Sequence, residues 1–259
     1  MILRRLGNKK KVAKLILPHF TPHKIYIEPF FGAGGMFFQK PKAKYNIVND
    51  LDSDVFNLFQ VVMNQKEELE KAFYMMPIHS DLLEYWEENE ETEPIRKALR
   101  FIMLSNMRLF GKKGCLRFGE LNNKYGFYEN LKNVNKYLTD VQFNNRDFRT
   151  FFSCYSIEKQ NGFIYCDPPY LGTTDNYSNS FTEQDTIELF EVLIKTGCKF
   201  AISEFDNPIV LELAKKHGLE VITIGERQNL KNRRTEILIV NYQSPALYSL
   251  FSSEHLNLC

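Results

Sequence analysis

A short apolar run that ends in two prolines places the strongest constraint on how this chain folds. Residues 162–166, Gly-Phe-Ile-Tyr-Cys, have the length and composition of a buried β-strand. Asp167, Pro168, Pro169 and Tyr170 follow directly. Consecutive prolines cannot continue a sheet or enter a helix interior, so the chain must leave the sheet there in an extended, restricted conformation. Open α/β sheets bind ligands at the carboxyl ends of their strands, which makes this corner a candidate functional site.

The residues of this corner suit methyl transfer to an exocyclic amine of a nucleobase. The carboxylate of Asp167 can accept one N–H of the amine and the carbonyl of Pro168 the other, which localises the nitrogen lone pair. Pro169 stiffens the segment, and acceptors that cannot relax lower a reaction barrier. The ring of Tyr170, rather than its hydroxyl, is expected to stack on the base. The alternative is an ordinary proline-rich surface turn, so the rest of the chain must support the assignment.

A glycine-rich turn follows the first expected strand, residues 24–28. It spans residues 29–36, Pro-Phe-Phe-Gly-Ala-Gly-Gly-Met, and is expected to open a helix. Glycine lets a backbone approach a ligand closely because no side chain intervenes. No Lys-Ser or Lys-Thr pair follows as in a P-loop, so a nucleoside triphosphate is not expected.

An acidic residue at the end of the second expected strand, residues 45–49, completes a nucleoside-binding pattern. Asp50 lies at the spacing at which an acid bonds ribose hydroxyls in dinucleotide-type folds. Asp52 and Asp54 compete for this role, although Asp52 also suits the cap of a helix expected at residues 55–63. Asp50 is preferred because it directly follows the strand. The turn and the acid together predict a nucleoside-bearing cofactor without a pyrophosphate.

Alternating strand and helix patterns on both sides of a helical segment predict an α/β fold with an insert. Residues 1–54 and 137–259 are expected to form the catalytic domain, and residues 55–136 an inserted domain with a loop at 111–128. The last two strands have no helix between them, so the final strand is expected to be antiparallel to its neighbour. The expected strands are residues 24–28, 45–49, 141–143, 162–166, 199–203, 219–224 and 236–242.

Charge is unevenly distributed along the insert, although the net charge of the whole chain is only +1. Residues 66–93 contain ten acidic residues and two lysines, whereas residues 96–136 contain ten basic residues and two glutamates. The basic part is a candidate phosphate-contacting surface for a nucleic acid. The alternative is a solvated basic face that pairs with the acidic segment before it. The expected DNA contacts are Arg108, Lys112, Lys113, Arg117 and Lys124.

Composition excludes several other classes of protein. Hydrophobic residues at 44% and charged residues at 25% are typical of a soluble globular protein. No apolar run approaches the ~20 residues that span a bilayer, and no signal peptide is visible, so an intracellular protein without a membrane partner is expected. The cysteines are odd in number and form no C-x-x-C pair, which argues against a disulfide framework or a zinc site. We expect no metal.

The order of these motifs resembles that of the Dam-like N6-adenine DNA methyltransferases of the α group, the D12 class. The resemblance implies a seven-stranded Rossmann-like methyltransferase sheet and a mainly helical insert that recognises double-stranded DNA. It also implies S-adenosylmethionine as methyl donor and a target adenine flipped out of the duplex. The matching segments are residues 7–9, 28–34, 49–50, the insert, 147–148, 167–170, Ser203 and 234–241.

The resemblance also assigns site residues by position. Residues 167–170 would hold the flipped adenine. Arg5 stands where the family usually has an aromatic residue, and Glu204 follows Ser203 where the family commonly has Asn. The positions that would line the cofactor site are Arg5, Lys9, Phe30, Gly32, Gly34, Asp50 and Asp167.

Two other functions remain compatible with the residues. A cytosine-N4 DNA methyltransferase uses a similar amine, although such enzymes more often carry Ser at the position of Asp167. A catalytically silent nucleic-acid-binding relative could keep the fold. The expected setting is the cytoplasm of a bacterial or phage-infected cell, as a monomer or weak dimer. A cognate restriction endonuclease is a candidate partner, and GATC a candidate recognition sequence.

Overall fold

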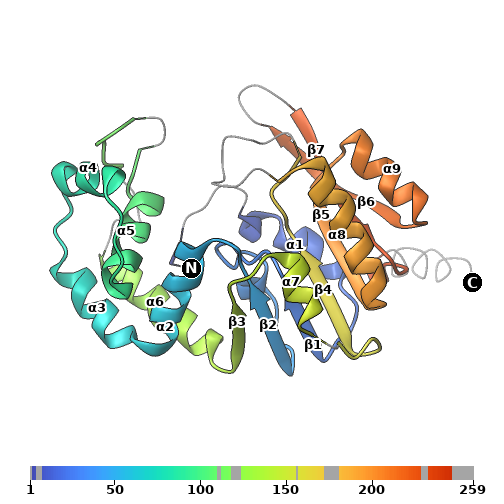
Figure 1. Cartoon of the computed structure of the whole chain (residues 1–259), viewed down its shortest axis with the longest axis horizontal. Helices are drawn as coiled ribbons and strands as arrows, with labels where there is room; N and C mark the ends of the chain where they lie inside the picture. Colours follow the sequence, from blue (N-terminus) through green and yellow to red (C-terminus); the bar gives the residue numbers. More distant parts are fainter. Residues whose placement is uncertain are drawn as a thin grey trace, which may run out of the picture.

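The computed structural model describes residues 2–3, 8–109, 112–117, 124–155, 157–171, 181–228 and 233–246. Within these residues seven strands form one sheet in the order β3-β2-β1-β4-β5-β7-β6 (Figure 1). The strands are β1 Ile25–Glu28, β2 Tyr45–Asn49, β3 Val141–Asn144, β4 Gly162–Cys166, β5 Lys199–Phe205, β6 Glu220–Gln228 and β7 Arg233–Val240. This is the expected α/β sheet, and the strand pattern of the sequence found each member.

Strand direction also follows the prediction. The five strands from β3 to β5 pair in parallel, so their carboxyl ends share one edge of the sheet. β7 is antiparallel to both β5 and β6 and lies between them. Only residues 229–232 separate β6 from β7 along the chain, and antiparallel neighbours need only such a short connection, whereas parallel neighbours need a crossover.

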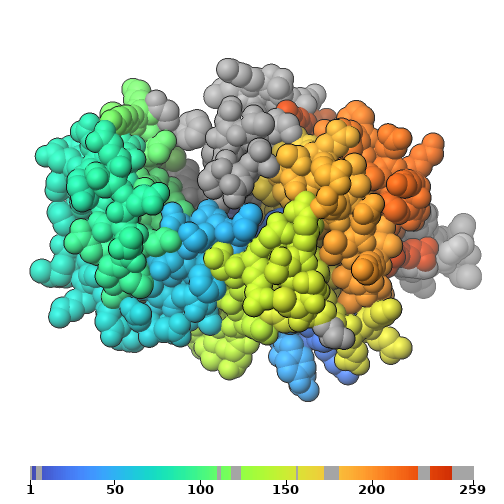
Figure 2. Space-filling view, in the orientation of Figure 1, coloured from blue at the N-terminus to red at the C-terminus, as the bar shows by residue number. Residues whose placement is uncertain are grey.

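Helices cover both faces of the sheet and form a separate lobe beside it. α2 to α6 stand together beyond β3, and Figure 2 shows this lobe next to the part that carries α7 and α8 (Figures 1 and 2). The described helices are α1 Ala13–Ile16, α2 Ser53–Asn64, α3 Lys66–Met75, α4 Ser80–Glu88, α5 Pro94–Asn106, α6 Lys124–Leu138, α7 Phe148–Ser153, α8 Glu183–Thr196 and α9 Pro208–Lys216. The 3-10 helices are η1 Lys9–Lys11, η2 Leu17–His19 and η3 Phe37–Gln39. None of the described helices combines the length and apolar character needed to cross a bilayer.

Two hydrophobic cores lie on opposite faces of the sheet. The strand β4 is buried throughout, and its residues alternate between the cores because side chains of a strand point to opposite faces in turn. Phe163 and Tyr165 join the core that includes α1 and α2 to α6. Ile164 and Cys166 join the core beneath α7, α8 and α9. Burial on both faces explains why this segment reads as a continuous apolar run.

Two local expectations were wrong. The glycine turn does not open an α-helix, because only η3 follows it and Lys40 is already extended (φ −107°, ψ 155°). Lys40 precedes Pro41, which disfavours the helical conformation for the residue before it. The expected loop at 111–128 overlaps α6, which begins at Lys124. Helical spacing of the buried Phe127, Leu131, Val134 and Leu138 explains α6, and the adjacent basic and aromatic residues obscured this pattern.

A buried asparagine at the end of β2 ties together the loops that follow β1 and β3. The Asn49 amide donates to the carbonyls of Pro29 (3.0 Å) and Arg146 (2.9 Å), and its oxygen accepts from the Arg146 amide (3.0 Å). These loops follow β1 and β3, so one side chain fixes the edge of the sheet at which ligands bind.

We expect Asn49→Asp to lower the free energy of unfolding by about 2 to 4 kcal/mol, since each buried group left without its partner costs about 1 to 3 kcal/mol. The carboxylate has the same shape but cannot donate to the two carbonyls. Urea unfolding measures the loss, with Asn64→Asp at the exposed end of α2 as the control. A loss below about 1 kcal/mol would show that the hydrogen bonds of Asn49 contribute little to stability.

Candidate active site

A cavity of about 270 Å³ lies where the carboxyl ends of β1, β2, β3 and β4 meet. It joins the glycine turn to the Asp167 corner, so the two regions that the sequence singled out face one space. Its lining residues are Asn8, Lys9, Glu28, Pro29, Phe30, Phe31, Gly32, Ala33, Gly35, Met36, Asn49, Asp50, Leu51, Asp52, Arg146, Asp147, Phe148, Arg149, Asp167, Pro169, Phe181 and Asp185.

A buried ion pair holds the carboxylate at the end of β4. The Lys9 ammonium lies 2.6 Å from Asp167 Oδ1, and the Lys9 side chain is only 2% exposed. Asn8 caps the short helix η1 by accepting from the Lys10 amide at 2.9 Å. The cap therefore sets the position of η1 and, through it, the ammonium that compensates Asp167.

Asp50 shapes the glycine turn from the end of β2. Its Oδ2 accepts from the Gly32 amide at 2.6 Å, and its Oδ1 accepts from the Asp52 amide at 2.9 Å. Gly32 has a φ of +53°, a conformation that favours glycine. Of the two competing acids, Asp52 caps α2 and Asp54 pairs with Lys97 at 3.3 Å. Asp52 also lines the cavity, so the preference for Asp50 as the ribose-binding acid stays a prediction.

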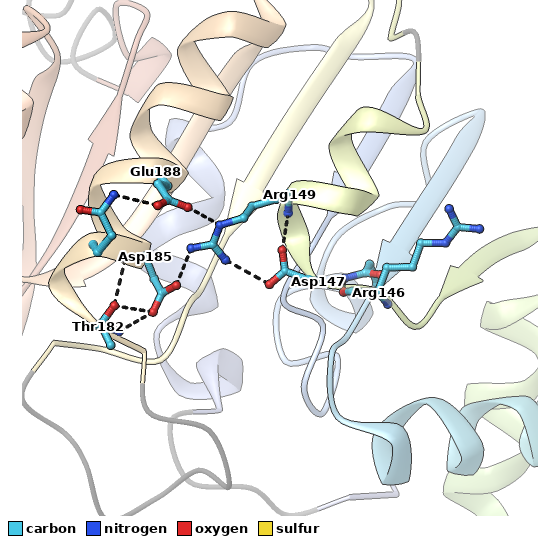
Figure 3. A network of polar contacts seen from close by, with 8 residues as sticks. Arg146, Asp147, Arg149, Thr182, Asp185 and Glu188 are labelled. Carbon is cyan, nitrogen blue, oxygen red and sulfur yellow. Dashed lines mark hydrogen bonds and ion pairs between the residues drawn. The ribbon is translucent and has the colours of Figure 1, made fainter.

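A network centred on Arg149 fixes the wall between α7 and α8 (Figure 3). The Arg149 guanidinium contacts the carboxylates of Asp147, Asp185 and Glu188 and lies 4.3 Å from the centre of the Phe148 ring. Three carboxylates raise the pKa of the guanidinium further above its usual range despite partial burial. Because Asp147 begins α7 and Asp185 lies in the first turn of α8, the network joins the two helix ends.

Three aromatic rings form a second part of this wall. Phe30 lies 5.8 Å from both Phe148 and Phe181 between ring centres, and Phe148 lies 6.1 Å from Phe181. All three residues line the cavity. Such a group of rings suits contact with a planar heterocycle.

Charge in the cavity is predominantly acidic. The lining contains six carboxylates and three basic groups. Glu28 is fully buried beside Asp167, and burial, reinforced by the Asp167 charge, raises the pKa of Glu28 to about 8. The Tyr26 hydroxyl donates to Glu28 Oε2 at 2.7 Å and partly offsets that burial. This lining favours a cationic ligand and disfavours a pyrophosphate.

The structure gathers most of the predicted site residues. Lys9, Phe30, Gly32, Asp50, Asp167 and Pro169 line the cavity, whereas Gly34, Pro168 and Tyr170 do not. Gly34 has a φ of +67°, and a Cβ there would lie 2.4 Å from the Phe38 ring. Glycine at this position is therefore required by the conformation and packing of the turn. Arg5 lies outside the described residues. Glu28, Gly35, Phe148 and Arg149 also line the cavity and were not predicted as site residues. Glu28 ends an expected strand and Gly35 lies in the predicted glycine turn, so their positions were a usable signal.

Tyr170 has contacts that the sequence did not predict. Its hydroxyl donates to Glu236 Oε1 at 3.0 Å, and the ring is only 8% exposed. The Lys9 ammonium lies 4.5 Å from the ring centre, and the Phe205 ring packs edge to face at 4.6 Å. The hydroxyl therefore anchors the ring from within the protein.

The predicted DNA contacts lie on the helical lobe, where several have acidic or carbonyl partners. Arg108 lies 3.4 Å from Glu87, and Lys113 pairs with Glu88. Lys124 donates to the carbonyls of Tyr74 (2.6 Å) and Met76 (2.8 Å). Lys112 is exposed, and the Arg117 amide donates to the Met107 carbonyl at 2.6 Å. Pairing with the acidic segment thus applies to Arg108 and Lys113, and the DNA contacts stay a prediction.

A known family matches most of this sequence. The family model described as D12 class N6 adenine-specific DNA methyltransferase matches residues 6–231, which is most of the chain. The chain belongs to this family. It is an S-adenosylmethionine-dependent enzyme that methylates N6 of adenine in DNA.

Relatives of this methyltransferase align along nearly its whole length. It is 27% identical over 271 residues to the DNA adenine methylase of Salmonella typhi, which covers 93% of this chain and 94% of that protein. It is 27% identical over 263 residues to a type II methyltransferase of Lactococcus lactis subsp. cremoris, which covers 88% of this chain and 91% of that protein. A Streptococcus mutans methyltransferase solved in complex with SAH aligns over 93% of this chain and 99% of that chain, with 13% identity and a TM-score of 0.43.

The close approach of Gly35 to η1 predicts a strong effect of a single methyl group. A Cβ at Gly35 would lie 2.4 Å from Asn8 Oδ1 and 2.8 Å from the Lys9 backbone nitrogen. Gly35→Ala must push η1 outward and displace Lys9 from Asp167. We expect the variant to bind S-adenosylmethionine at least about 10-fold more weakly than the wild type, as measured by calorimetry, because a lost charge-assisted contact is worth about 1.5 to 3 kcal/mol. Gly225→Ala, where a Cβ meets nothing within 4 Å, is the control and should bind normally.

The raised pKa of Glu28 predicts a specific pH dependence of stability. Between about pH 4.3, where an unfolded glutamate titrates, and pH 8, the folded protein keeps a proton that the unfolded chain releases. Stability contributed by this group therefore falls as pH rises through that window. In Glu28→Gln, the free energy of unfolding measured in urea between pH 5 and 7.5 should no longer contain this decrease. Its slope against pH should therefore be less negative than that of the wild type by the equivalent of about one proton. Parallel curves for the variant and the wild type would contradict the raised pKa.

Proposed function

We propose that the cavity binds S-adenosylmethionine and that the Asp167 corner holds the N6 amine of an adenine flipped out of duplex DNA. One observation carries the proposal: Asp167, compensated by buried Lys9, faces the same cavity as the Gly32 turn and Asp50. A base amine held at Asp167 would therefore be next to a donor held by the turn.

The residues of the cavity fit this donor. A Cβ at Gly32 would meet nothing within 4 Å, so the glycine leaves open space beside the turn. Asp50 would bond the ribose hydroxyls, the rings of Phe30, Phe148 and Phe181 would contact the adenine moiety, and the acidic lining would favour the positive charge. S-adenosylmethionine, when bound, supplies a methyl group made electrophilic by a cationic sulfur.

The residues of the corner mainly orient the attacking nitrogen. Asp167 accepts one N–H of the amine and the Pro168 carbonyl accepts the other, so the lone pair is directed at the donor. Pro168 and Pro169 keep these acceptors in place, which is preorganisation of the kind that lowers a barrier. No strong base is required, because the methylated nitrogen carries a positive charge and loses its proton readily.

DNA binding is assigned to the helical lobe, residues 55–136, as the target-recognition domain. Extruding the base costs a few kcal/mol, which stacking on Tyr170 and phosphate contacts by the lobe would offset. Arg108 and Lys113 would exchange their carboxylate partners in α4 for phosphates, while exposed Lys112 can bind directly. Arg117 and Lys124 complete the proposed surface.

The names and organisms of the relatives support a proposal for the cellular setting. We place the enzyme in the cytoplasm of a bacterial or phage-infected cell, acting on double-stranded DNA as a monomer or weak dimer. Similarity to a type II methyltransferase supports a cognate restriction endonuclease as a partner. GATC stays a candidate recognition sequence, on the resemblance of the motif order to that of the Dam-like enzymes.

Expression in a host without methylases, followed by sequencing that detects modified bases, tests the function. The expected result is N6-methyladenine at one short recurring sequence. N4-methylcytosine would reassign the substrate, and unmodified DNA together with absent cofactor binding would identify a silent relative.

Asp167→Ala should abolish turnover, because the amine loses its charged acceptor and Lys9 loses its partner. DNA affinity, measured by fluorescence anisotropy, should stay within about 3-fold of the wild type, since phosphate contacts supply most of that affinity. Asp167→Asn is the matched variant that keeps the shape and removes the charge. Equal losses of turnover and DNA affinity in Asp167→Ala would argue against the assigned role.

A further inference from the structure

Two buried glutamates lie beneath the Asp167 corner and outside the cavity lining. Glu204 belongs to β5 and Glu236 to β7, and they are 2% and 1% exposed. In the register of these antiparallel strands, Phe205 opposes Glu236 and Glu204 opposes Ile237. Residues that oppose each other share a face, and successive residues alternate, so the two glutamates point to opposite faces of the sheet.

Glu236 controls the positions of two residues at the corner. Its Oε1 accepts from the Tyr170 hydroxyl at 3.0 Å and lies 3.4 Å from the Lys9 ammonium. Lys9 in turn lies 2.6 Å from Asp167 and 4.5 Å from the centre of the Tyr170 ring. Glu236 therefore holds the aromatic ring and the counter-ion of the acceptor in one arrangement.

Glu204 holds the next residue of the same segment from the other face. Its carboxylate accepts from the Phe205 amide at 2.8 Å and also from the Leu171 amide. Leu171 packs in the core beneath α7 and α8, whereas Tyr170 packs against Phe205 on the face of Glu236. Two consecutive residues of the corner, Tyr170 and Leu171, are thus held by glutamates from opposite faces of the sheet, an arrangement called the glutamate clasp below.

We propose that Glu236 and Glu204 are positioning residues for the methyl transfer. They act through Tyr170, Lys9 and Leu171 and touch neither substrate. The inference rests on the proposed role of the Asp167 corner, because the segment that they hold is the one assigned to the target amine. A ring and an ammonium fixed in advance lower the cost of orienting the base, so losing the glutamate clasp should reduce kcat more than it raises KM.

The test compares Glu236→Gln, Glu236→Ala, Glu204→Gln and Glu204→Ala under steady-state conditions. The substrate is the duplex that carries the site methylated by the wild type. Gln keeps an oxygen acceptor for Tyr170 or Leu171, whereas Ala removes it. We expect kcat to fall about 10- to 100-fold in the Ala variants, with KM for both substrates within about 3-fold, because each Ala variant leaves a buried donor without its acceptor and frees the residue that it held. Glu204→Gln should recover most of this loss. Glu236→Gln should recover only part of it, because Lys9 still loses its negatively charged partner at position 236.

A double-variant comparison shows whether Glu236 acts through Tyr170. If it does, combining Glu236→Ala with Tyr170→Phe should cost little more kcat than the larger single loss, because Glu236→Ala already removes the acceptor for the Tyr170 hydroxyl. Glu220→Gln on β6 is the control, because its carboxylate accepts from the Ser244 amide away from the corner. Thermal unfolding of each variant establishes that the fold is retained, and Gln variants remain informative if an Ala variant does not fold.

The outcomes separate this inference from the proposed function. A wild type that forms no N6-methyladenine overturns the function and, with it, the assigned purpose of the glutamate clasp. A wild type that methylates adenine, with Ala variants within about 2-fold of its kcat, leaves the function intact and overturns the inference. Additive losses in the double variant would equally overturn action of Glu236 through Tyr170.

Discussion

The buried ammonium of Lys9 is the interaction on which the active site depends. It lies between Asp167 and Glu236 and faces the Tyr170 ring, with almost no exposure to solvent. Removing an ion from water costs several kcal/mol unless partners surround it, so the end of β4 and the middle of β7 are bound electrostatically to η1. The capping of η1 by Asn8 and the absence of a side chain at Gly35 are what allow the ammonium to reach this position.

Sequence reasoning succeeded where one local pattern fixes one local structure. The buried run before Asp167 could only be a strand, and the carboxyl-edge rule then brought Asp50, Gly32 and Asp167 together. It failed where the structure of a segment depends on residues outside the local pattern. Pro41 shortens the helix after the turn through its effect on Lys40, and α6 was hidden by residues that also suit a loop. Glu236 could not be connected to Tyr170 because 66 residues separate them, and only the antiparallel insertion of β7 brings them into contact.

Charge patterns illustrate the same limit of local reasoning in the helical lobe. The sequence separates an acidic stretch from a basic one, and it cannot tell whether the two face each other or face a ligand. In the fold, Glu87 and Glu88 of α4 contact Arg108 and Lys113, so part of the basic excess is balanced internally. The Lys113–Glu88 pair is exposed and therefore worth little, so a phosphate backbone can replace Glu88 at small cost. Internal pairing and DNA binding are therefore compatible uses of the same side chains.

The anchoring of Tyr170 bears on how a flipped base is stabilised. Stacking contributes about 1 to 3 kcal/mol per base, which only matches the cost of extrusion if little is lost in ordering the ring. A free tyrosine would have to give up its rotamer freedom when the base arrives. Here the hydroxyl bond to Glu236 and the contacts with Lys9 and Phe205 have already fixed the ring during folding. The stability of the folded sheet therefore offsets the entropy cost of ordering the ring, which gives the buried Glu236 a role under the proposed catalytic corner.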